Sequence, residues 1–119
     1  MKTSLQGRSI LIVEDEPLIA IDIEQELANA GANLTTTNVL DHALILVEHD
    51  GLSAAVLDHA IGESNCSPLY ERLNERGIPF IIYTAFDLPE KDRKGGVLIS
   101  KPALPGVIGA ALKRLLPPG

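Results

Sequence analysis

Residues 10–17 read Ile-Leu-Ile-Val-Glu-Asp-Glu-Pro, so a run of four apolar residues is followed at once by three acids and a proline. A continuous apolar run of this kind is typical of a strand buried on both faces, in a parallel sheet covered by helices. Pro17 suits the first turn of a helix, because the N–H group that it lacks would have no partner there. The stretch therefore predicts a strand over 9–13, an acidic junction, and a helix that starts at Pro17.

Composition limits the class of protein and the kind of partner. The chain has 119 residues, 45% of them hydrophobic and only 3% aromatic, which suits one domain over 1–119 with an aliphatic core. Its formal net charge of −6 argues against direct nucleic-acid binding, because such surfaces need clustered Lys and Arg. No apolar run approaches the length of about 20 residues that spans a bilayer, and no signal peptide is recognisable. We expect a cytoplasmic protein that binds neither nucleic acid nor membrane.

Strand-like and helix-like segments alternate along the rest of the chain. Short apolar or β-branched runs predict strands over 33–37, 54–57, 80–84 and 97–100. Amphipathic segments predict helices that run from Pro17 to a stop at Gly31, over 42–49 after an Asp41 cap, from Pro68 to Arg76 after a Ser67 cap, and over 106–116. Leu44 and Val107 are expected to face the core. This alternation favours right-handed βαβ crossovers and a parallel sheet with helices on both faces.

Two connecting segments lack an apolar pattern. The segment 59–66 reads as a polar loop and contains Cys66, the single cysteine, which excludes an internal disulfide. Residues 87–96 read DLPEKDRKGG and have almost no apolar stripe, so any helix there is expected to be short or poorly packed.

Residues that follow the strands carry most of the chemistry. The carboxyl ends of parallel strands lie along one edge of a sheet, where α/β proteins bind ligands. At those ends stand Glu14 and Asp15 after the first strand, Asp58 after the third, Thr84 at the end of the fourth, and Lys101 with Pro102 after the fifth.

This set of side chains predicts a cation site. Two carboxylates about 4 Å apart repel by about 4 kcal/mol at an effective dielectric of about 20, so three acids at one edge need a cation among them. Oxygen ligands that are partly open to water suit Mg²⁺. An Asp beside Mg²⁺ and a Lys is also equipped to accept a phosphoryl group, because the two cations neutralise its oxygens.

Four motifs in order resemble one known family. They are LIVEDEP over 11–17, AAVLDHAIG over 54–62, PFIIYTAF over 79–86 and LISKP over 98–102. Together they resemble the receiver domains of two-component response regulators, over nearly the whole chain from about residue 9 to 116. The resemblance implies a flavodoxin-like α/β fold with a five-stranded parallel sheet of order 2-1-3-4-5 and, here, a fourth helix that is short or disordered.

The resemblance also implies a role for each site residue. Asp58 would be the phosphoacceptor, Asp15 would bind Mg²⁺ directly, and Glu14 would bind it mainly through water. The backbone carbonyl of Ala60 would be a further ligand, and Lys101 would pair with the phosphoryl group.

Four further residues would shape the switch. Thr84 would hydrogen-bond a phosphoryl oxygen, Phe86 would border the path of hydrolytic water, and Pro102 would shape the turn after Lys101 through a cis bond. Leu98 departs from the family, because receivers commonly carry Tyr or Phe three residues before the Lys. His59 is expected at the rim of the pocket.

The function implied is that of a bacterial signalling domain. The phosphoryl donor would be a histidine kinase or a histidine phosphotransfer protein, whereas the output partner cannot be inferred. A pseudo-receiver, which has the same fold but is not phosphorylated, is the main alternative. A phosphatase-like enzyme would need a second Asp two residues after the nucleophile, where Ala60 stands. A purely structural explanation of the three acids at 14–16 is that negative charge is favourable near the N-terminus of the following helix.

Overall fold

The computed structural model describes residues 5–117. Its central sheet contains β1 Ser9–Val13, β2 Asn33–Thr37, β3 Ala54–Leu57, β6 Phe80–Thr84 and β7 Val97–Ser100. All neighbours in this sheet pair in parallel, and the spatial order is β2-β1-β3-β6-β7. Because β4 and β5 lie in a separate hairpin, this is the expected 2-1-3-4-5 order of the five main strands.

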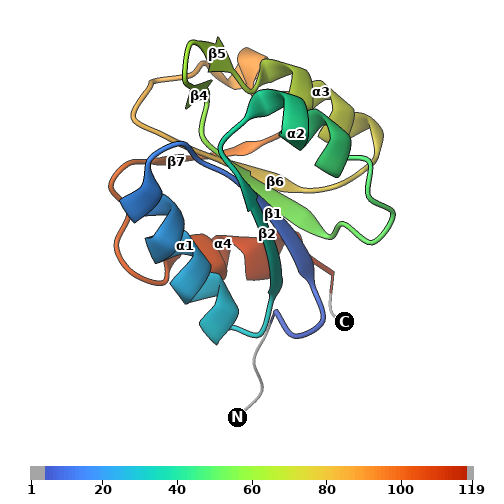
Figure 1. Ribbon diagram of the computed structural model, residues 1–119, viewed down its shortest axis with the longest axis vertical. Coiled ribbons are helices and arrows are strands. Elements are labelled where there is room, and N and C mark those ends of the chain that lie inside the picture. The colour runs from blue at the N-terminus through green and yellow to red at the C-terminus, as the bar shows by residue number, and fades with distance from the viewer. Residues whose placement is uncertain (1–4, 118–119) are drawn as a thin grey trace.

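Helices cover both faces of the sheet, as Figure 1 shows. One face is covered by α1 Pro17–Asn29 and α4 Val107–Leu115, and the other by α2 Leu40–Leu46 and α3 Ser67–Glu75. Within the described range, no helix is long and apolar enough to cross a membrane.

The sheet separates two apolar clusters, and β1 contributes to both. Leu11 and Val13 lie in the cluster under α2 and α3, whereas Ile10 and Ile12 lie in the cluster under α1 and α4. All four side chains are at most 1% exposed. The continuous apolar run therefore reflects burial on both faces, which is what confines the acidic residues to the end of the strand.

The starts of three helices differ from the sequence prediction, and α4 begins at Val107, one residue after the predicted start. Helix α2 begins at Leu40 and ends at Leu46, and its N-cap is Val39 rather than Asp41. The Thr37 hydroxyl accepts the Val39 N–H at 3.2 Å and turns the chain early. Helix α3 begins at Ser67, one residue before the prediction.

Two side chains predicted to face the core are partly exposed. Leu44 and Val107 each retain 37% of their accessible surface. Leu44 lies on the short α2, and Val107 is the first residue of α4, where the helix has only begun to cover the sheet.

The segment after β3 is a small hairpin rather than an irregular loop. Strands β4 Ala60–Ile61 and β5 Ser64–Asn65 pair antiparallel, and Gly62 adopts a φ of 59° at their turn. Cys66 follows the hairpin as the N-cap of α3 and is fully buried, not exposed in a polar loop. Burial raises the pKa of its thiol to about 12, so the thiol stays protonated at neutral pH.

The segment before β7 contains very little helix, as predicted. Only the 3-10 turn η1 Glu90–Asp92 forms there, and none of its residues is buried. Leu88 is 8% exposed and anchors the segment to the core, while the Arg93 side chain donates a hydrogen bond to the Leu88 carbonyl at 2.8 Å. The fourth helix of the expected fold is thus reduced to a single turn.

A close approach at Gly96 determines how β7 lies against β6. A Cβ atom at Gly96 would come within 2.3 Å of the Phe80 ring and 3.0 Å of Ile82. We therefore expect Gly96→Ala to lower the free energy of unfolding by about 1–3 kcal/mol, measured by urea denaturation. The same substitution should cost less in a Phe80→Leu background, which relieves the clash. An equal cost in both backgrounds would contradict this explanation.

Candidate functional site

Two acids stand where β1 ends. The Glu14 N–H donates to the Thr37 carbonyl at 3.1 Å, so the parallel ladder holds the backbone of Glu14 one residue beyond the strand. Its side chain is only 1% exposed. Asp15 is the more accessible of the two, and its carboxylate accepts the Gly62 N–H at 2.9 Å. The hairpin after β3 therefore holds Asp15 in place.

Asp58 stands at the same edge, where β3 ends. Its N–H donates to the Val13 carbonyl at 2.9 Å, which extends the β1–β3 ladder to this position. Its Oδ1 accepts the Ala60 N–H at 3.3 Å. Only 9% of its side chain is exposed, so Asp58 is largely buried.

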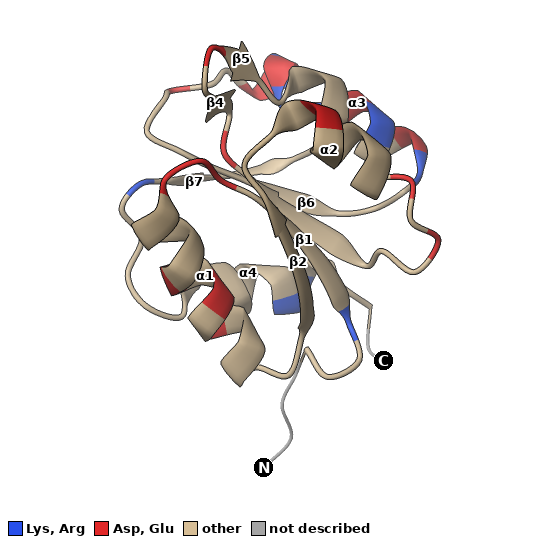
Figure 2. Cartoon of the chain, viewed as in Figure 1, with Lys and Arg blue, Asp and Glu red and all other residues tan. Residues whose placement is uncertain are grey.

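Lys101 approaches these acids from the end of β7. Its ammonium lies 2.8 Å from Asp58 Oδ2 and 3.0 Å from Glu14 Oε1. The backbone N–H of Lys101 donates to the Thr84 carbonyl at 3.0 Å, which fixes the position from which the side chain extends. The Lys101–Pro102 peptide bond is cis, as expected from the resemblance. Figure 2 shows the acidic segments after β1 and β3 at one edge of the sheet, with a basic residue at the end of β7.

The cluster remains short of positive charge. Burial raises the pKa of Glu14 above its usual range, because loss of solvent outweighs the hydrogen bond from Lys101. Burial also acts to lower the pKa of Lys101, but hydrogen bonds to Asp58 and Glu14 outweigh it and raise that pKa. Lys101 thus pairs with two of the three carboxylates, and Glu14, the most buried of the three, is the one whose pKa burial raises.

The acidic group fits a divalent cation. Glu14, Asp15 and Asp58 each offer a carboxylate oxygen, and these three oxygens lie within 4.8 Å of one another. Lys101 Nζ donates a hydrogen bond to Glu14 Oε2 at 3.2 Å, whereas the buried Oε1, although 3.0 Å from the same nitrogen, accepts none. An unsatisfied buried oxygen beside two further carboxylates is the donor set that Mg²⁺ takes in proteins.

Comparison with known proteins reveals two relatives of the same name. The phyllosphere-induced regulator PhyR of Methylorubrum extorquens is 32% identical over 117 residues, which cover 90% of this chain and 43% of PhyR. The crystal structure of PhyR from Brucella abortus is 30% identical with a TM-score of 0.77, over 96% of this chain and 50% of that one. The chain thus spans about half the length of these relatives. No protein-family model matches it.

Two further solved structures match along nearly their whole length. The receiver domain of sensor histidine kinase PA1611 from Pseudomonas aeruginosa, with a magnesium ion in its active-site cleft, has a TM-score of 0.78 at 23% identity and covers 92% of this chain and 97% of its own. One chain of the crystal structure of histidine kinase ThkA in complex with response regulator protein TrrA matches with a TM-score of 0.80 at 19% identity. The match covers 92% of this chain and 99% of that one. The chain therefore has the fold of a receiver domain.

None of the residues assigned to the switch belongs to the acidic group of Glu14, Asp15 and Asp58. Thr84 is 1% exposed, and its hydroxyl accepts the Phe86 N–H at 3.3 Å. Phe86 is 58% exposed, whereas Leu98 packs against the core under α2 and α3. The Ala60 N–H contacts Asp58, and a role for the Ala60 carbonyl as a metal ligand stays a prediction.

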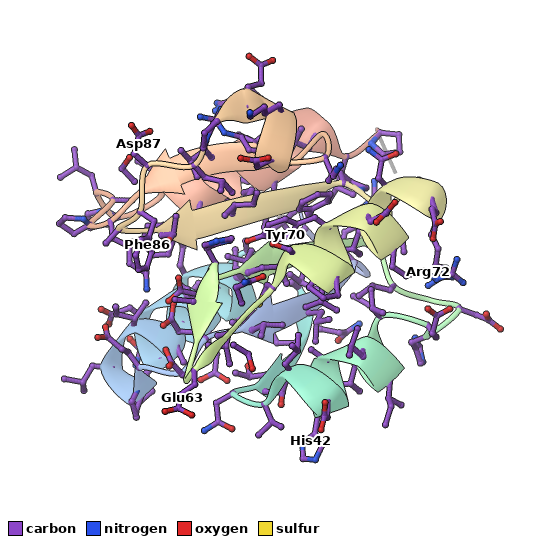
Figure 3. All side chains as sticks on the ribbon, turned by 90° about the horizontal axis from the view of Figure 1, so that it is seen from above. His42, Glu63, Tyr70, Arg72, Phe86 and Asp87 are labelled. Atoms are coloured by element: carbon purple, nitrogen blue, oxygen red, sulfur yellow. The ribbon has the colours of Figure 1, made fainter. Side chains whose placement is uncertain are left out.

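An aromatic group beside Asp58 was not predicted from the sequence. The His59 Nδ1 lies 2.9 Å from the hydroxyl of Tyr70, a fully buried residue of α3, and the His59 ring meets the edge of Phe86 at 6.1 Å between centroids. Figure 3 labels Tyr70 on α3 and Phe86 beyond the end of β6. Only folding brings α3 to this edge, so no spacing in the chain could have indicated the contact.

The cluster predicts stabilisation by Mg²⁺. Because a ligand of the native state alone stabilises by about 2.7 kcal/mol at 100 times its Kd, millimolar Mg²⁺ should raise the melting temperature by several degrees. Asp15→Ala should abolish this rise, whereas Asp22→Ala, which removes an exposed acid of α1, should preserve it. An unchanged rise in Asp15→Ala, measured by thermal denaturation with and without Mg²⁺, would show that the ion binds elsewhere.

Proposed function

We propose that this chain is a phosphoacceptor of a bacterial two-component or phosphorelay system, with Asp58 as the residue that is phosphorylated. The observation that carries the proposal is the position of Lys101 Nζ, 2.8 Å from Asp58 and 3.0 Å from Glu14, whose carboxylates lie within 4.8 Å of an oxygen of Asp15. A lysine and a divalent-cation site on either side of one buried aspartate suit the transfer of a phosphoryl group.

Different residues have different roles in the transfer. An oxygen of Asp58 attacks the phosphorus of a phosphohistidine, a P–O bond forms, and the P–N bond breaks with its electron pair left on the imidazole. Lys101, already beside Asp58, moves its ammonium to the arriving phosphoryl oxygens. Glu14, Asp15 and Asp58 would hold Mg²⁺, which supplies further positive charge to the same oxygens.

Thr84 gives the site a means of signalling. Its hydroxyl now accepts a hydrogen bond from the Phe86 N–H. Donation from the same hydroxyl to a phosphoryl oxygen would draw the end of β6 toward Asp58 and alter the contact between Phe86 and His59. The domain would therefore act through protein contact in the cytoplasm, and would catalyse only its own phosphorylation and dephosphorylation.

Mass spectrometry tests the proposal directly. Incubation with phosphoramidate and Mg²⁺ should add the mass of one phosphoryl group to the intact protein. Asp58→Asn should add none, whereas Asp87→Asn, which changes an exposed acid just after Phe86, should be labelled like the wild type. No label on the wild type would favour the pseudo-receiver, and a label that persists in Asp58→Asn would place the acceptor elsewhere.

A groove beside Lys101 suits the phosphodonor protein. It lies between α1 and the connection 101–106, has a volume of about 610 Å³, and has Lys101 among its lining residues. Leu104 lines the same groove and is 77% exposed. A donor helix seated there would bring a phosphohistidine close to Lys101 and the neighbouring Asp58. The kinase complex of a neighbour with the same fold supports a kinase as the donor.

A substitution at Leu104 distinguishes docking of the donor protein from the phosphoryl transfer itself. We expect Leu104→Glu to slow phosphoryl transfer from a histidine kinase or phosphotransfer protein by about tenfold or more, because a charge replaces an apolar contact at the interface. Transfer from phosphoramidate, which needs no docking, should be unchanged. Ile45→Glu is the matched control, since Ile45 is 73% exposed on α2 at the opposite face. Equal rates for both variants with the protein donor would exclude the groove.

A further inference from the structure

Tyr83 is the one residue that contacts both the Lys101 side chain and the connection that follows it, among the interactions of the described chain. It stands on β6 directly before Thr84, is 7% exposed, and belongs to the apolar cluster under α1 and α4. Nothing in the resemblance to receivers assigns it a role.

Each end of the Tyr83 side chain makes a separate contact. The Lys101 ammonium lies 5.6 Å from the centroid of the ring, within the range of a cation–π interaction. The hydroxyl accepts the Ala103 N–H at 2.9 Å. The ring therefore lies beside the charge of Lys101, and the hydroxyl is tied to the backbone two residues later.

We propose that Tyr83 is a positioning residue that holds the Lys101 ammonium against Asp58. A lysine side chain has four rotatable bonds, and its ammonium could otherwise turn into the groove between α1 and the connection 101–106, which Lys101 also lines. The face of the Tyr83 ring attracts the ammonium from this side, while Asp58 and Glu14 attract it from the other. The ammonium is thereby kept where a phosphoryl group arrives.

The hydroxyl of Tyr83 supports the same geometry through the main chain. The backbone N–H of Lys101 donates to the carbonyl of Thr84, the neighbour of Tyr83. Two residues later, the Ala103 N–H donates to the Tyr83 hydroxyl. Lys101 is thus held by residues 83 and 84 at both its backbone and its side chain. Leu98 provides no aromatic ring on β7, and the ring that contacts the Lys101 ammonium comes from Tyr83 on β6.

The inference rests on the proposed phosphorylation of Asp58, so its test has one readout that does not depend on that reaction. In the unphosphorylated protein, the ring current of Tyr83 should shift the Lys101 Hε protons upfield in the NMR spectrum. The shift should persist in Tyr83→Phe, which keeps the ring, and vanish in Tyr83→Leu. Leu112→Ala, which removes a buried side chain of the same cluster without touching Lys101, should keep the shift.

The second readout is the rate of phosphorylation by saturating phosphoramidate with Mg²⁺. Tyr83→Leu should be about five- to tenfold slower than the wild type, and Tyr83→Phe within about twofold, since the ring supplies most of the attraction. Pentafluorophenylalanine at position 83 keeps the shape of the ring but reverses its quadrupole, and should be slow like Leu. This variant preserves the packing, so the test holds even if Tyr83→Leu fails to fold.

The outcomes are separable. A wild-type protein that takes up no phosphoryl group would refute the proposed function, and the Lys101 shift would still decide whether Tyr83 holds the ammonium. A phosphorylated wild type with no upfield shift of Lys101, or variants lacking the ring's attraction that react at the wild-type rate, would overturn the role of Tyr83 alone.

Discussion

The ion pairs of Lys101 with Asp58 and Glu14 are the interaction on which the rest of the site depends. They join the ends of β7, β3 and β1, and so span the sheet from its edge strand to its centre. Buried charges are costly unless paired, and here one ammonium serves more than one carboxylate. The negative charge that remains uncompensated would favour the binding of a divalent cation at this point.

The apolar sheet makes this concentration of charge possible. The central strands are buried on both faces, so their side chains fill two clusters that hold no charged side chain among the described residues. Charged side chains therefore stand where the strands end. The backbone ladders continue one residue further, through Glu14 and Asp58, and therefore hold the first acid after each strand as firmly as the strand itself. Asp15, beyond the ladder, needs the hairpin and its Gly62 N–H instead.

The reduced fourth helix and Leu98 distinguish this receiver fold from the usual pattern. With one 3-10 turn in place of a helix, few buried side chains tie residues 86–96 to the core. Near Asp58, aromatic contacts instead involve His59, Phe86 and Tyr70, and near Lys101 they involve Tyr83. A response to a phosphoryl group would therefore involve these aromatic contacts, because β7 carries no aromatic ring.

The sequence alone determined the order of strands and helices, the burial of the strands on both faces, and the gathering of Glu14, Asp15, Asp58 and Lys101 at one edge. These features follow from hydrophobic period and from the rule that parallel strands end together, which are local or topological properties. Only the tertiary structure decided the starts of α2 and α3, the hairpin that holds Asp15, the burial of Cys66, and the contacts of Tyr70 and Tyr83. Helix starts depend on single hydrogen bonds such as that of Thr37, and the aromatic contacts join residues from different elements. Neither kind of contact leaves a period or spacing in the chain.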